Sequence, residues 1–135
     1  VARGAEAAKA AGAKRALVLP VSVPSHCALM RPAAEKLRER LKKVSVRAPA
    51  IPVLHNVHVQ AEADPDKIRD ALVRQVEQPV RWVETIRRME ADGATRIVEC
   101  GPGKVLAGLN KRIVSQAQTA AIHDPKSIAE ELAKQ

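Results

Sequence analysis

Apolar residues recur along this chain at two spacings, and segments of the two kinds follow one another. Segments with apolar residues three or four positions apart predict helices, and short β-branched runs between them predict strands. Strands separated by helical segments are typical of an α/β fold with mostly parallel strands. The predicted helices span 2–11, 32–43, 65–78, 83–92, 104–116 and 127–134, and the predicted strands span 15–23, 51–60, 95–100 and 119–123.

Two of these helices carry more specific signals. Asp64 followed by Pro65 marks a helix start, because the carboxylate can cap the first turn and the missing proline N–H has no partner there anyway. In the next helix, the spacing of Val83, Ile86 and Met89 predicts that all three face the core.

The 135 residues suit a single domain, but the composition predicts weak independent stability. Apolar residues make up 46% of the chain, yet Trp82 is its only aromatic residue. Alanine and valine therefore supply much of the core, and each buries less area than an aromatic ring. No run of about 18 uninterrupted apolar residues is present to span a membrane. Cys27 and Cys100 are far apart, which favours a reducing cytoplasm over a disulfide framework.

A net charge of +8 favours an acidic partner, whether a protein, an anionic cofactor or a nucleic acid. Nucleic acid is disfavoured, because there is no arginine-rich tail, no zinc-binding spacing and no row of aromatic residues. A shared metal ion is also disfavoured, because His55 and His58 are three apart on a predicted strand and would face opposite sides. His123 is isolated in the sequence.

His26 is the strongest candidate for chemistry. It follows a β-branched run and a proline turn, where the backbone is fixed and the imidazole stays reachable. A histidine there can serve as a general base, or it can only hydrogen-bond nearby backbone. Ser25 is rejected as its nucleophile, because adjacent side chains rarely point at one another. The glycine turn at 101–104 lacks the spacing of a nucleotide-binding phosphate loop.

Residues 19–30, with the sequence LPVSVPSHCALM, resemble the histidine motif of bacterial malonyl-CoA:acyl carrier protein transacylases. Residues 68–75 and 99–112 are similar to further segments of that family. The resemblance implies a general base at His26, which removes a proton from a serine and later from the phosphopantetheine thiol of acyl carrier protein. It also implies that the backbone carbonyl of Gln75 orients the imidazole. The implied substrate is malonyl-CoA, with no further cofactor and no metal, and the implied location is the cytoplasm.

The resemblance also implies a place in a larger fold. Residues 1–29 would be the last helix and strand of a ferredoxin-like small subdomain together with the histidine loop. Residues 30–135 would be the C-terminal part of an α/β-hydrolase-like acyltransferase subdomain. The GHSxG serine motif of the family is absent from the chain, and on the family pattern it precedes Val1. We therefore expect the chain alone to be inactive and to aggregate, oligomerise or remain partly molten. The alternatives are an inert fragment and a non-catalytic module that binds an acidic carrier protein or nucleic acid.

Overall fold

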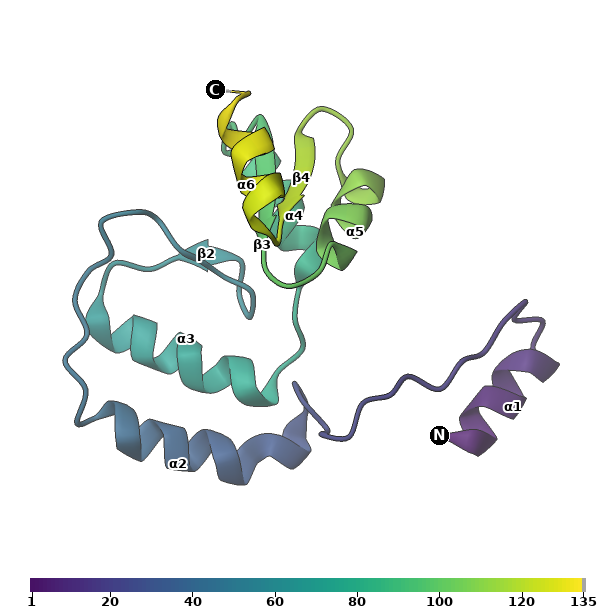
Figure 1. Ribbon diagram of the computed structural model, residues 1–135. Coiled ribbons are helices and arrows are strands. Elements are labelled where there is room, and N and C mark those ends of the chain that lie inside the picture. Colours follow the sequence, from purple (N-terminus) through teal and green to yellow (C-terminus); the bar gives the residue numbers. More distant parts are fainter. Residues whose placement is uncertain (135) are drawn as a thin grey trace.

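The computed structural model describes residues 1–134 and contains helices, one parallel strand pair and one short hairpin (Figure 1). This confirms the predicted α/β class. None of the described helices is long and apolar enough to cross a membrane. The helices are α1 (Ala2–Ala10), the 3₁₀ turn η1 (Ala28–Met30), α2 (Arg31–Leu41), α3 (Pro65–Glu77), α4 (Trp82–Ala91), α5 (Val105–Ile113) and α6 (Pro125–Leu132), and the strands are β1 (Leu54–His55), β2 (Gln60–Ala61), β3 (Arg96–Cys100) and β4 (Gln118–Ile122).

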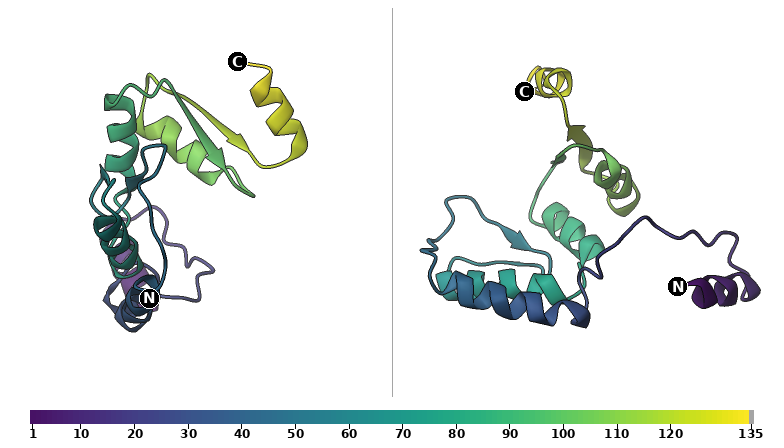
Figure 2. Two further views of the ribbon diagram at one scale, coloured as in Figure 1. Left: turned by 90° about the vertical axis from the view of Figure 1, so that its left-hand side faces the viewer. Right: turned by 60° about the horizontal axis from the view of Figure 1, so that its bottom comes forward.

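Helices α2 and α3 lie side by side (Figures 1 and 2). Ala34 of α2 and Ala71 and Val73 of α3 are buried, and Val73 lines the same hollow as Leu41 of α2. Helix α3 begins where the sequence predicts, because the Asp64 carboxylate accepts hydrogen bonds from the N–H groups of Asp66 and Lys67 at 2.8 and 3.1 Å. These bonds satisfy donors that have no partner inside the helix.

The second packed region surrounds the parallel pair of β3 and β4. Residue Arg96 pairs with Gln118 at one end, and Cys100 pairs with Ile122 at the other. Helix α5 connects the two strands, as predicted, because two parallel strands need a crossover connection between them. The core of this region consists of buried Ile86, Ile97 and Val114, with Trp82, Met89, Ile113 and Ala117 packed against them.

The predicted strand at 15–23 is wrong. The segment has no strand structure, and Leu17, Val18 and Leu19 are 64%, 71% and 70% exposed. In Figure 1 and in the right-hand view of Figure 2, this segment and α1 extend away from the other elements. Strand propensity reflects packing against neighbours, and none of the strands that the structure describes pairs with this segment.

Two further expectations need correction. The predicted strand at 51–60 contracts to the two residues of β1, because the chain turns after His55 and returns as β2 in an antiparallel hairpin. Val59 lies in that turn with a positive φ of 61°. Val83 on α4 does not face the core but is 44% exposed, whereas Ile86 is buried as predicted. The spacing of apolar residues predicts which face of a helix is buried. The width of the buried part of that face depends on the elements that pack against it.

Candidate active site

His26 lies in the loop that leads into η1, and its side chain is exposed. Its backbone has a φ of 58°, in the left-handed region that non-glycine residues seldom occupy. Such a conformation persists where surrounding contacts hold it, and it is enriched at functional sites. The loop therefore presents an accessible imidazole on a backbone whose conformation needs support.

The support comes from the last turn of α3. The carbonyl oxygen of Gln75 lies 2.6 Å from His26 Nδ1, and the carbonyl oxygen of Val76 accepts a bond from the His26 backbone N–H at 3.2 Å. The last carbonyls of a helix have no partner within the helix, so they are free to accept these bonds. The structure thus brings together the two predicted site residues, which are 49 positions apart. Their catalytic roles stay a prediction.

The contact with Gln75 also assigns the protons of the imidazole. A carbonyl oxygen can only accept a hydrogen bond, so Nδ1 must carry the hydrogen of the bond. In the neutral ring Nε2 is then unprotonated and able to accept a proton. This arrangement suits a general base whose second nitrogen is held by an orienting partner.

The glycine turn at 101–104 joins β3 to α5, as the sequence predicts. The residue before α5, Lys104, makes no side-chain cap. Instead, Glu99 on β3 accepts a hydrogen bond from the Ala107 N–H at 2.8 Å. A carboxylate at a helix N-terminus both satisfies a free donor and complements the helix dipole. No local sequence signal indicates this role of Glu99, because the contact depends on how the turn brings β3 against the start of α5.

The inference that His55 and His58 face opposite sides is wrong. Their ring centroids are 5.7 Å apart, because His58 lies in the turn of the hairpin rather than on a strand. Burial and the neighbouring His58 lower the pKa of His55, and Glu62 opposes that shift. His58 Nε2 lies 3.0 Å from Glu62 Oε1. Within residues 1–134, no three histidine, cysteine or acidic side chains are grouped so as to hold a metal ion.

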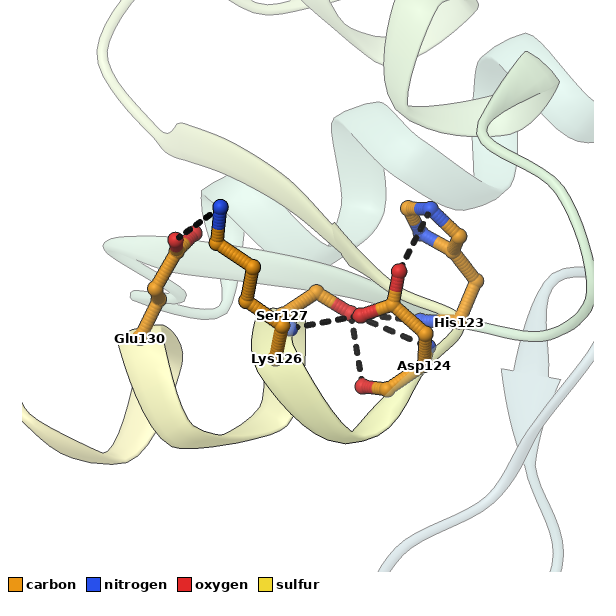
Figure 3. A network of polar contacts seen from close by, with 5 residues as sticks. All are labelled: His123, Asp124, Lys126, Ser127 and Glu130. Carbon is orange, nitrogen blue, oxygen red and sulfur yellow. Dashed lines mark hydrogen bonds and ion pairs between the residues drawn. The ribbon is translucent and has the colours of Figure 1, made fainter.

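A second group of polar residues contains a serine, a histidine and an aspartate at the start of α6 (Figure 3). The Ser127 hydroxyl donates to the Asp124 backbone carbonyl at 2.9 Å and accepts the backbone N–H groups of His123 and Asp124. The Asp124 carboxylate in turn accepts the Ser127 N–H at 2.7 Å. This is a helix capping box and not a catalytic triad, because the serine proton is directed to a carbonyl oxygen. His123, which is isolated from other candidate residues in the sequence, has a polar neighbour in the structure, because its ring lies 3.6 Å from the Asp124 carboxylate.

No family model matches the chain, but individual proteins do. The malonyl CoA-acyl carrier protein transacylase of Escherichia coli K12 is 54% identical over 129 residues, which is 96% of this chain and 42% of that protein. The chain is therefore a relative of the malonyl CoA-acyl carrier protein transacylases. The namesake from Bacillus subtilis is 43% identical over 123 residues, which is 91% of the chain and 39% of that protein. These matches confirm the resemblance predicted from the sequence.

Solved structures of transacylases have the same fold over this part. The acyl carrier protein S-malonyltransferase of Vibrio cholerae gives a TM-score of 0.88 at 53% identity, covering 96% of this chain and 42% of that one. A malonyl-transacylase solved in complex with a type II polyketide synthase acyl carrier protein gives 0.93 at 49% identity, covering 99% and 43%. The chain thus spans about two fifths of the length of the transacylases that it matches.

Proposed function

We propose that this chain supplies the general base of a malonyl-CoA:acyl carrier protein transacylase. The observation that carries the proposal is the contact of 2.6 Å between His26 Nδ1 and the Gln75 carbonyl, which leaves Nε2 free to accept a proton on an exposed loop. The identity to named transacylases over 96% of the chain supports the choice of reaction. The nucleophile is a serine that these 135 residues do not provide in a GHSxG motif.

In the first half of the proposed reaction, Nε2 of His26 removes the hydroxyl proton of the serine. The serine oxygen attacks the thioester carbonyl of malonyl-CoA, the C–S bond breaks, and the coenzyme A thiolate takes the proton back from Nε2. In the second half, Nε2 removes the proton of the phosphopantetheine thiol of acyl carrier protein. The thiolate attacks the carbonyl of the malonyl-serine ester, a new C–S bond forms, the ester C–O bond to serine breaks, and the released serine oxygen takes the proton from Nε2.

The position of His26 at the end of α3 suits these proton transfers. A helix carries partial negative charge at its C-terminus, which stabilises the positive charge that the imidazole acquires with each proton. The Gln75 carbonyl keeps the ring in one orientation during both halves of the reaction. No carboxylate partner is needed, because a carbonyl oxygen already fixes the tautomer.

The finer division of the fold belongs to the same proposal. Residues 1–29 are assigned to the end of a ferredoxin-like small subdomain with the histidine loop, and 30–135 to the C-terminal part of an α/β-hydrolase-like subdomain. The way in which α1 and the segment 15–23 extend from the other elements supports this boundary (Figure 1). The free cysteines Cys27 and Cys100 fit a reducing cytoplasm.

The proposed macromolecular partner is acyl carrier protein. A related malonyl-transacylase has been solved in complex with such a carrier, and the net charge of +8 on this chain suits an acidic protein. Without a serine nucleophile the chain alone is proposed to be inactive.

A chimera tests the proposal: the chain replaces the matching 42% of the Escherichia coli transacylase. We expect the chimera to transfer malonyl groups from malonyl-CoA to acyl carrier protein. Substitution His26→Ala lowers the rate by about 10²- to 10⁴-fold, the usual contribution of a general base. His123→Ala is the control, because the ring of that histidine lies at the α6 cap, 3.6 Å from the Asp124 carboxylate, and makes no hydrogen bond to His26 or Gln75 among the described contacts. A folded chimera without transfer, or full activity after His26→Ala, contradicts the proposal.

A further inference from the structure

The end of α3 contacts the histidine loop and the start of α2 through three consecutive residues. The Gln75 carbonyl holds the His26 ring and the Val76 carbonyl holds the His26 backbone. The next residue, Glu77, accepts a hydrogen bond from Arg31 Nε at 3.2 Å. Arg31 is the first residue of α2, five positions after His26. The same turn of α3 therefore holds both the base and the helix that follows it.

Only the third of these contacts uses a side chain of α3. The two carbonyl bonds form wherever α3 ends at the right place, whatever the side chains of residues 75 and 76. Their lengths depend on how the end of α3 lies against the start of α2. The pair of Arg31 and Glu77 connects these two ends directly, and Glu77 is the better buried partner, with 20% of its side chain exposed.

A second ion pair joins the same two helices farther from the loop. Arg38 NH1 lies 3.5 Å from Asp70 Oδ1. Residue 38 follows residue 31 by seven positions, and residue 70 precedes residue 77 by seven, which is about two helical turns on each helix. The two pairs have the same chemistry and connect the same helices, but Arg38 and Asp70 lie about 10 Å from the end that holds His26.

We propose that Arg31 and Glu77 are positioning residues for His26. This inference rests on the proposed function, in which His26 is the base. The ion pair holds the end of α3 against the histidine loop, and this keeps the bond from Nδ1–H to the Gln75 carbonyl. That bond in turn keeps Nε2 unprotonated in the neutral ring. Loss of the pair weakens the bond and increases the tautomer that carries its proton on Nε2, which cannot act as the base.

The tautomer is measured directly by nitrogen NMR of His26 in the ¹⁵N-histidine-labelled chimera, with the ring neutral, and the His26 signals are assigned by their loss in His26→Ala. We expect Glu77→Gln to lower the ratio of the Nδ1-protonated to the Nε2-protonated tautomer of His26 by about two- to fivefold, the range for a partly exposed ion pair. Asp70→Asn removes the other interhelical pair, together with the pair of Asp70 and Arg74 within α3, and is the matched control. It is expected to leave the His26 ratio unchanged.

The charge-reversed double variant, Arg31→Glu with Glu77→Arg, restores the pair in the opposite sense and should recover the ratio. In the chimera, Glu77→Gln should lower kcat in proportion to the fraction of His26 that remains in the Nδ1-protonated tautomer, with KM unchanged. A tautomer ratio that Glu77→Gln leaves as it was, or that Asp70→Asn changes equally, overturns the inference. A shifted ratio in a chimera that transfers no malonyl group would instead support the positioning role and reject the proposed function.

Discussion

Replacing Ile86 with alanine tests how α4 packs on the parallel strands. Ile86 is 1% exposed and lies at the centre of the core that it forms with Ile97 and Val114. The substitution removes three carbon atoms, at about 0.8 kcal/mol each on transfer, and the cavity that remains adds to this loss. The better helix propensity of alanine returns about 0.5 kcal/mol. The expected loss in the free energy of unfolding is about 3 kcal/mol.

Urea unfolding followed by tryptophan fluorescence measures this loss, and a cooperative transition of the monomeric chain would at the same time contradict the expectation that the chain alone is partly molten. Trp82 is the only tryptophan of the chain, packs against the same core and donates its indole N–H to Asn110 Oδ1 at 3.1 Å. With a urea dependence of about 1.5 kcal/mol per molar, a loss of 3 kcal/mol lowers the midpoint by about 2 M. At the lower end of the usual range, a total stability of about 5 kcal/mol leaves the variant about 2 kcal/mol, which corresponds to a midpoint of about 1.3 M urea.

Val83→Ala is the matched control on the same helix. Val83 is 44% exposed, so the substitution removes little buried area and is expected to cost less than about 1 kcal/mol. Equal losses for Val83→Ala and Ile86→Ala would refute this reasoning. They would mean that α4 buries the wider face that its apolar spacing predicts, and not the narrower one that the structure has.

The helix caps allow two further predictions. Glu99→Ala removes the acceptor for the Ala107 N–H and should lower the free energy of unfolding by about 1 kcal/mol in the same urea titration, whereas Glu99→Gln, which keeps an acceptor, should cost less. Backbone hydrogen bonds, from Lys67 and Asp66 to Asp64 and from Ser127 to Asp124, lower the pKa of both carboxyls below their usual 3.8. The contribution of these two caps to stability is therefore complete above pH 3.8 and is lost as the pH falls through the lower folded-state pKa. The amide NMR shifts of residues 67 and 127 should report titration midpoints below 3.8. Midpoints at or above 3.8 would mean that the caps do not form.

The sequence predicts the elements that local signals define. Asp64 caps α3 because the carboxylate and the N–H groups that it binds are within three residues of one another. The parallel strands β3 and β4 are predicted equally well from the sequence, because two short apolar runs separated by a helix favour a parallel strand pair. Segment 15–23 has the composition of a strand, but a strand also needs a partner. Its apolar side chains therefore remain exposed.

The candidate site was predictable only in part. No spacing rule connects His26 with Gln75 across 49 positions. The acceptor is a backbone carbonyl, which every residue has, so the type of residue at position 75 does not indicate the contact. The resemblance supplied that pairing. The left-handed backbone of His26 was not predicted, because only a small fraction of non-glycine residues adopts that region, even though histidine is enriched there. The approach of His55 to His58 was missed for a similar reason, since a turn with a positive φ at Val59 replaced the expected strand.

The contacts that hold the histidine all come from a continuous part of the chain. Residues 24–77 contain the loop, η1, α2, the hairpin and α3, and the bonds to His26 join only the two ends of this part. In the proposed reaction, the positioning of His26 is thus separate from the supply of a nucleophile. A serine from elsewhere needs only to reach Nε2 on the exposed side of the loop, because the opposite nitrogen is already held. For this reason the tautomer of His26 should be the same in the chain alone and in the chimera, whereas malonyl transfer requires the chimera.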